Sequence, residues 1–329
     1  MLWTKDKKFH PHPYSREADL EAAISQVEGD LFGEKRIYLD VKKKIGAKGK
    51  TNNIPDGYLI DLTSAKEPVL YVVENELASH DPLKHVAVQI LEFSLSFEAA
   101  PHKVKAIVKE ALAAHPAKWK LCEQYAADNG FENVDYLLEL MTFGGDSFRA
   151  LVIIDELVEE LETLLISRFK FPVEVLTLER YKAGKEVAYR FEPFLYDVAS
   201  DITASGKGTD PSEIDTIVVP AREDGFKSAF LGEQKWWAIR IHASMIPKIK
   251  YIAAYRVAPI SAITHIAPVA AIEPWKDTGK YIVNFAGKPK KIQPISLVPK
   301  PKGKVKALQS PRYASREKLL AARNLDQVF

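Results

Sequence analysis

Three carboxylates on two neighbouring strand-like segments are the residues of this sequence best placed to do chemistry. Asp56 opens the segment "DGYLIDL", and Glu74 and Glu76 close the next segment, "VLYVVENEL". Side chains two positions apart on a strand share a face, so Glu74 and Glu76 repel each other unless a cation or a proton lies between them. The apolar run before them is typical of a central strand, so a solvated face explains these acids less well than a bound metal ion does.

Mg²⁺ is the ion that this donor set suits best. It prefers carboxylate oxygens, usually one or two from protein, with water and substrate phosphate completing an octahedral shell. If the two strands are antiparallel, Asp56 at the start of one and Glu74 near the end of the other converge on one ion. We therefore predict a site for Mg²⁺, with Mn²⁺ as an acceptable substitute, at Asp56 and Glu74.

Helices and further strands must surround this pair. A helix is expected from Ser15 to about Leu31, and another from Asp81-Pro82, where Asp is a good cap and Pro suits the first helical position. Further helices are expected over Lys103 to Asn129 and Val134 to Thr142. The continuous apolar run "RALVIID" predicts a buried central strand. This order predicts a mixed α/β domain with helices on both faces of the sheet.

The pattern "P55-D56 … E74-N75-E76", preceded by a helix that bears Glu and followed by one that bears Gln, resembles the PD-(D/E)XK, or restriction-endonuclease-like, nuclease superfamily. The resemblance covers roughly residues 15 to 180. It implies a mixed sheet flanked by helices, with Asp56 and Glu74 as metal ligands. Glu76 would take the third motif position, Glu21 would correspond to the family's helix acid, and Gln89 to its helical glutamine.

Glu76 departs from the family pattern, because Lys is usual at that position. Some members use Glu there, but the same change also occurs where activity has been lost. Lys84, one turn into the following helix, is a candidate for the missing cation, and His80 and His85 are candidates for assistance. An active metal nuclease and an inactive nuclease-like scaffold therefore both stay open.

Basic residues cluster in two places although the net charge is only +2. The first is the segment "VKKKIGAKGKTNN", and the second begins at Lys288. Clustered basic charge is typical of a phosphate-binding surface, whereas solvated lysine loops are the alternative. Phosphodiester hydrolysis needs a cationic surface to hold the polyanion. The first cluster lies between "KRIYLDV", which is expected to be a strand, and the segment that Asp56 opens. The candidate DNA-binding residues are Lys42, Lys43, Lys44, Lys48 and Lys50.

The second part of the chain has a different residue pattern. The segment "DITASGKGTDPSE" has the composition of a linker, and short β-type runs follow it, which predict a small barrel or sandwich. We expect a nuclease-like domain at 1–205, a small β-barrel domain at 206–297, and a basic tail with a short helix at 298–329.

The segment "WWAIRIHASMIPKIKYIAAYRVAPISAITHIAPVAAIEPW" resembles the PUA-like small barrels of the ASCH and EVE kind, over about residues 214 to 297. That resemblance implies RNA binding or the reading of a modified base flipped from duplex DNA, by stacking on aromatic rings and polar contacts to the base edge. Most of the aromatic residues at strand spacing should belong to the core, and two or three would line a pocket. The candidates are Trp236, Trp237, Tyr251, Tyr255, Thr264, His265 and Trp275.

Whole-chain properties set limits on these interpretations. The 329 residues suffice for two domains, and the single cysteine, Cys122, excludes an intrachain disulfide and a cysteine zinc cluster. No apolar run predicts a signal peptide or a membrane span. We expect a cytoplasmic protein that does not interact with membranes.

The sequence thus predicts a Mg²⁺-dependent DNA endonuclease of the restriction or genome-defence kind, with a C-terminal module that selects the DNA, with a modified base as a candidate for what it recognises. Two rivals remain: a noncatalytic nucleic-acid-binding protein on a decayed nuclease fold, and an RNA-binding or RNA-processing protein. Double-strand cleavage needs two active sites or two events, which makes a homodimer plausible.

Overall fold

The computed structural model describes residues 2–3, 5–45, 54–80, 82–144, 147–158, 161, 163–165, 169–199, 209–276 and 278–329. The chain divides into two compact units, one up to Phe194 and one from Leu195 to Phe329. The boundary therefore lies before the expected one at residue 205. Part of the segment expected to be a linker, residues 201–208, falls outside the described residues.

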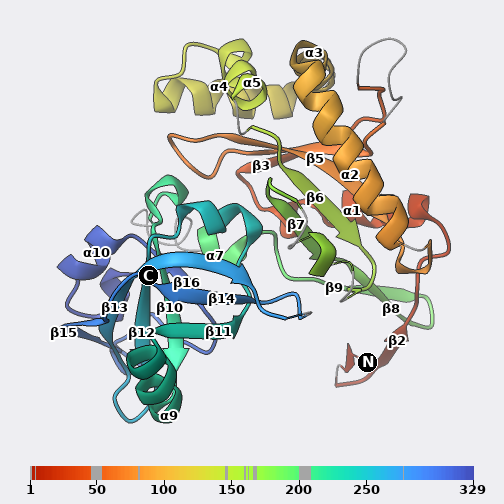
Figure 1. The fold of residues 1–329 in the computed structure, drawn as a ribbon. Coiled ribbons are helices and arrows are strands. Elements are labelled where there is room, and N and C mark those ends of the chain that lie inside the picture. Colours follow the sequence, from red (N-terminus) through yellow and green to blue (C-terminus); the bar gives the residue numbers. More distant parts are fainter. Residues whose placement is uncertain are drawn as a thin grey trace. The chain divides into compact units, whose positions relative to one another are not determined.

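The first unit is built on a mixed five-stranded sheet (Figure 1). Its strands, in spatial order, are β3 (Arg36–Asp40), β4 (Gly57–Asp61), β5 (Val69–Glu76), β6 (Ala150–Ile154) and β7 (Val173–Thr177). The pairs β3–β4 and β4–β5 are antiparallel, whereas β5–β6 and β6–β7 are parallel. The antiparallel pairing that the acidic pair requires is therefore present.

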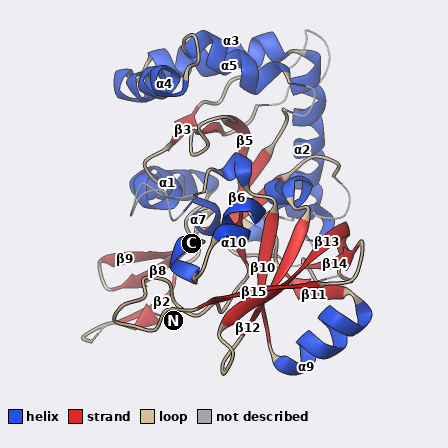
Figure 2. Ribbon diagram, turned by 90° about the vertical axis from the view of Figure 1, so that its left-hand side faces the viewer, coloured by secondary structure: helices blue, strands red, loops and turns tan. Residues whose placement is uncertain are grey.

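Helices cover both faces of this sheet (Figure 2). They are α1 (Glu17–Phe32), α2 (Pro82–Ala99), α3 (Pro101–Ala113), α4 (Pro116–Asn129) and α5 (Val134–Phe143). On β5, Leu70 and Val72 share one hydrophobic core with Val86 and Phe93 of α2, whereas Tyr71 lies edge-on to Phe194 on the other face. The expected mixed α/β architecture with a covered sheet is confirmed.

The helical stretch expected over Lys103 to Asn129 is two helices. Pro116 occupies the first turn of α4, where its missing N–H costs nothing, but the same ring cannot continue α3. A second, four-stranded sheet completes the unit in the order β1 (Leu2–Trp3), β2 (Lys8–Pro11), β8 (Glu179–Ala183) and β9 (Glu186–Arg190).

The second unit contains a curled seven-stranded sheet, as Figure 1 shows. Its strands are β10 (Thr216–Ala221), β11 (Lys235–Ile239), β12 (Tyr251–Arg256), β13 (Ala262–Pro274), β14 (Tyr281–Phe285), β15 (Lys290–Ser296) and β16 (Arg312–Ala314). The long strand β13 pairs with β12 and β15 through its first half and with β14 through its second half. This change of partner curls the sheet into half a barrel, where the sequence predicts a barrel or sandwich.

Short helical segments lie between the strands and longer helices of both units. They are η1 (Ala78–His80), α7 (Tyr196–Ala199), η2 (Pro211–Glu213), α9 (Glu223–Gly225), the π-helical segment η3 (Phe226–Glu233), η4 (Ala243–Lys248), α10 (Arg316–Ala321) and η5 (Leu325–Gln327). Asp197 of α7 lies 2.8 Å from Nε2 of His242, which holds this helix within the second unit.

Residues 298–329 belong to the second unit and do not form a separate tail. Strand β16 pairs with β10, and Leu319, Leu325 and Val328 are buried in the same core cluster as Val218 and Tyr255. Their apolar side chains explain why a segment this rich in lysine folds onto the sheet. Among the described residues, no helix is both long enough and apolar enough to cross a membrane.

Candidate metal and catalytic site

Asp56 is held at the junction of three strands of the first unit. Its backbone N–H donates to Val73 O at 3.1 Å, its carbonyl accepts from the N–H of Val41, and its Oδ2 accepts from the N–H of Asn75 at 2.9 Å. The next residue must be glycine, since a Cβ at Gly57 would lie 2.6 Å from the carbonyl oxygen of Leu39. The carboxylate is therefore fixed beside the backbone that joins Glu74 to Glu76.

Glu74 is a buried carboxyl group with only 4% of its surface exposed. Burial, together with the neighbouring charges of Asp56 and Glu76, raises the pKa of Glu74 to about 9. Its Oε2 is buried without a hydrogen-bond partner among the described residues. A buried oxygen without a donor is costly, and a proton or a cation would compensate for it.

Lys42, in the segment after β3, contacts Asp56 and Glu21. Its Nζ lies 2.5 Å from Oε1 of Glu21 and 3.4 Å from Oδ1 of Asp56. Partial burial lowers the pKa of Lys42, but the two carboxylates outweigh this and raise it above its ordinary value. Burial raises the pKa of Asp56, against the opposing effects of the Asn75 N–H and of Lys42. The structure thus brings together Asp56, Glu21 and a lysine that the sequence assigned to DNA binding.

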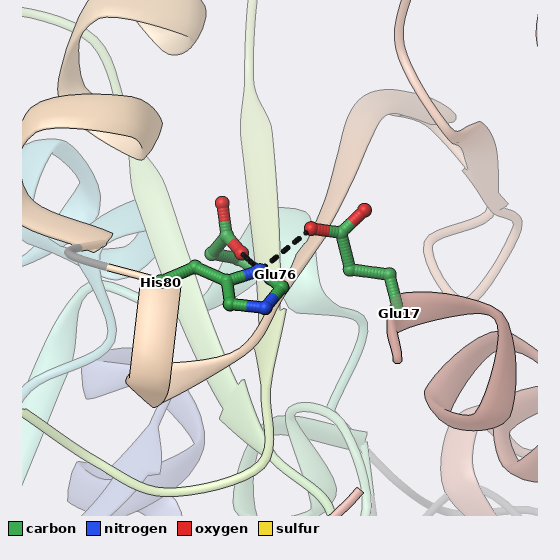
Figure 3. Close-up of side chains that lie close together, drawn as sticks. All are labelled: Glu17, Glu76 and His80. Carbon is green, nitrogen blue, oxygen red and sulfur yellow. Dashed lines mark hydrogen bonds and ion pairs between the residues drawn. The ribbon is translucent and has the colours of Figure 1, made fainter. Parts of the chain in front are cut away.

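A second group forms where β5 ends (Figure 3). Nδ1 of His80 lies 3.1 Å from Oε1 of Glu17 and 3.2 Å from Oε1 of Glu76. The hydrogen bond to Glu17 and the charge of Glu76 raise the pKa of His80. Burial and the charge of Glu17 in turn raise the pKa of Glu76, although the N–H of Leu77 donates to its Oε1 at 2.8 Å.

The remaining candidates of the first unit have different environments. Oε1 of Gln89 on α2 is buried without a hydrogen-bond partner among the described residues, and His85 is exposed. The side chain of Lys84 lies outside the described part of the chain, as do Lys48 and Lys50. Nζ of Lys43 lies 2.7 Å from Oε2 of Glu110, and Lys44 is exposed.

The base-recognition candidates of the second unit do not share one environment. Tyr255 and Thr264 are buried in the sheet, and Trp236 lies edge-on to Phe230. Arg316 stacks over Tyr251 with its guanidinium carbon 4.6 Å from the ring centroid.

His265 and the other two tryptophans are half-buried. His265 lies edge-on to Phe226, and burial lowers its pKa, as do Arg256 and Lys291. The rings of Trp237 and Trp275 stack on each other with their centroids 5.7 Å apart, and both side chains are half-buried. Nζ of Lys276 lies 5.0 Å from the Trp275 ring centroid.

Sequence reasoning did not assign Glu17 to the site. One signal was available, since Glu17 and Glu21 are four residues apart and share a helix face. His80 likewise follows Glu76 by four residues, but the turn that aims its ring back is visible only in the structure.

Comparison with known proteins adds no relative: no protein-family model, no curated protein and no solved structure matches the chain. The functional proposal therefore rests on the geometry of the candidate site.

Proposed function

We propose that this protein is a metal-dependent DNA endonuclease that hydrolyses phosphodiester bonds, with Asp56 and Glu74 as its metal ligands. The observation that carries the proposal is the meeting of Asp56, Glu74, Glu21 and Lys42 at one end of β4 and β5. These side chains are not simply a solvated acidic surface, because Glu74 is buried and one of its oxygens has no donor among the described residues.

The residues present fit a hard divalent cation. Two carboxylates supply oxygen ligands, and Oε2 of Glu74, which has no hydrogen-bond partner in the described part of the chain, is an acceptor that a cation would satisfy. When bound, Mg²⁺ or Mn²⁺ would supply Lewis-acid activation of a water molecule and stabilise the leaving oxygen. Because the pKa of Glu74 is raised to about 9 in the metal-free protein, this carboxyl gives up a proton to solvent when it becomes a ligand near neutral pH.

Lys42 supplies the ammonium group that the third motif position lacks. Its Nζ lies against Oδ1 of Asp56, and Glu21 holds it there. In this position it favours the ionised form of Asp56 and offers a positive charge to a phosphate or an attacking water. Glu76 at the usual lysine position is then compatible with activity.

The proposal also includes a finer assignment of the two folds. The order of α1, β3, β4, β5, α2 and β6 is the order that a restriction-endonuclease-like domain implies, and the mixed pairing about β5 supports it. The half-barrel of the second unit supports a PUA-like module. Its half-buried Trp237–Trp275 stack beside Lys276 is suited to bases and phosphate, so we propose that it selects DNA, including DNA with a modified base.

One observation favours a second candidate, a noncatalytic nucleic-acid-binding protein. The ammonium of Lys42 already compensates for the charges of Glu21 and Asp56 without any metal. In that case DNA or RNA would bind, but removing Lys42 would increase the affinity for Mg²⁺ without producing cleavage.

A substrate screen tests the proposal. Unmodified DNA, DNA with modified bases and RNA are incubated with the full-length protein in Mg²⁺ or Mn²⁺, and both binding and cleavage are measured. The proposal expects cleavage of at least one DNA, and loss of that cleavage without loss of DNA binding in Asp56→Ala and Glu74→Ala. Binding of DNA or RNA without cleavage of any DNA would reject it.

A further inference from the structure

We propose that Glu17, Glu76 and His80 bind a divalent transition-metal ion of the Mn²⁺, Co²⁺ or Zn²⁺ class, separate from the Asp56–Glu74 pair. The inference concerns metal binding and does not depend on the proposed nuclease reaction. It begins from the one group of three such side chains that converges among the described residues, with ligand atoms all within 4.8 Å of one another.

The spacing of the ligand atoms suits a metal ion. Metal–ligand bonds of about 2.0–2.1 Å in tetrahedral or octahedral geometry place neighbouring ligand atoms about 2.9–3.4 Å apart. Nδ1 of His80 already lies 3.1 Å from Oε1 of Glu17 and 3.2 Å from Oε1 of Glu76. Figure 3 shows both carboxylates turned towards the same ring nitrogen. The oxygens of Glu17 and Glu76 also lie within 4.8 Å of each other.

Three separate elements position these side chains. Glu76 ends β5, and its Oε1 is fixed by the N–H of Leu77. His80 closes η1, whose turn is held by the hydrogen bond from its own N–H to Leu77 O at 3.0 Å. Glu17 lies in the first turn of α1. The Glu76 side chain is buried, whereas those of Glu17 and His80 are each 44% exposed, so solvent can fill further coordination positions.

The charges beside the group also favour a cation. Glu74 shares the strand face of Glu76 two residues earlier and is only 4% exposed. Glu17 and Glu76 both act on its charge, which places the three carboxyl groups in one electrostatic neighbourhood. A cation in this neighbourhood offsets their mutual repulsion.

The imidazole decides which metal is preferred. Mg²⁺ takes oxygen ligands and keeps its waters, whereas Mn²⁺, Co²⁺ and Zn²⁺ accept imidazole nitrogen increasingly well. The Asp56–Glu74 pair offers only oxygen. The two sites should therefore differ in metal preference, with the His80 site retaining a transition metal in excess Mg²⁺.

Titration of the full-length protein with Co²⁺, followed by visible absorption and by equilibrium dialysis in excess Mg²⁺, tests the site. His80→Ala and Glu17→Gln should each weaken Co²⁺ binding at least about tenfold. The control His115→Ala, at an exposed histidine of the same unit, should leave it unchanged. Asp56→Asn should retain the Co²⁺ absorption.

Unchanged Co²⁺ binding in both His80→Ala and Glu17→Gln would overturn the inference, as would full displacement of Co²⁺ by Mg²⁺. Loss of binding in Asp56→Asn alone would also overturn it. Co²⁺ binding that depends on His80, in a protein that cuts no DNA, would instead support this site and reject the proposed nuclease function.

Discussion

The backbone N–H of Asn75 donates a 2.9 Å hydrogen bond to Oδ2 of Asp56, so the residue between Glu74 and Glu76 fixes the position of the Asp56 carboxylate. Asparagine at position 56 can still accept this hydrogen bond through its amide oxygen, but it carries no negative charge. Asp56→Asn should therefore fold normally and bind Mg²⁺ at least about tenfold more weakly, as calorimetric titration would measure. Asp30→Asn, an exposed acid on α1, is the matched control. Equal Mg²⁺ affinity in both variants would remove Asp56 from the metal site.

Glu74 makes the stability of the metal-free protein depend on pH. Its pKa rises from 4.5 in the unfolded chain to about 9 in the folded protein, so between these values the folded state holds a proton that the unfolded state has lost. Stability should therefore be fully present below about pH 4.5 and fall as the pH rises towards 9. Glu74→Gln should flatten this part of the profile and stabilise the protein at pH 8 by about 1–3 kcal/mol in chemical denaturation.

Saturating Mg²⁺ provides the internal control for this effect, because a bound cation keeps Glu74 ionised in the folded state. Saturating Mg²⁺ should therefore reduce the fall in stability of the wild type with rising pH. It should leave the flatter pH profile of Glu74→Gln unchanged. A wild-type profile that is flat from pH 5 to 9 without metal would contradict the assigned environment of Glu74.

Lys42→Gln separates the two roles open to this lysine. If its ammonium assists the reaction, the cleavage rate should fall about 100-fold, while Mg²⁺ affinity stays the same or increases because a competing cation is gone. Lys44→Gln, which removes an exposed charge from the same segment, should change only the salt dependence of DNA binding. Equal cleavage by the Lys42 and Lys44 variants would show that Lys42 acts only as one of several surface charges.

The ion pair between Arg36 and Asp61 should be important for the stability of the first unit. Nε of Arg36 lies 2.8 Å from Oδ2 of Asp61, both side chains are nearly inaccessible, and Nη1 also donates to the carbonyl of Phe194. Arg36→Met leaves the Asp61 charge buried, which should cost about 3–5 kcal/mol of unfolding free energy. Lys35→Met, at an exposed neighbouring position, should cost much less. A similar loss in both variants would argue against the buried pair.

The C-terminal segment should contribute to the stability of the second unit. Leu325 is fully buried, whereas Leu320 is 46% exposed. Leu325→Ala should therefore lower the unfolding free energy by about 2–5 kcal/mol, and Leu320→Ala by well under 1 kcal/mol. Equal, small effects in denaturant titrations would mean that residues 298–329 are a dispensable tail.

Much of the fold follows from local pattern. The apolar runs that become β5 and β6 mark buried central strands, and prolines mark where α3 and α4 begin. The proximity of Asp56 and Glu74 could be predicted because adjacent antiparallel strands place the start of one beside the end of the other.

Other features depend on contacts between segments far apart in sequence. The position of Lys42 depends on the path of the chain after β3, and the Glu17–Glu76–His80 group requires a helix, a strand and a turn to meet. The unit boundary at Leu195 and the packing of Leu325 likewise arise from tertiary burial, which the lysine-rich composition of the C-terminal segment conceals.

The decisive measurement is the cleavage of supercoiled DNA carrying modified and unmodified bases, with the wild type and Asp56→Asn compared side by side in Mg²⁺. We expect nicked or linear products from the wild type on at least one DNA, no products when Mg²⁺ is chelated, and none from Asp56→Asn. Wild-type rates of cleavage by Asp56→Asn, or an intact plasmid in every wild-type reaction with Mg²⁺ or Mn²⁺, would contradict the proposed function.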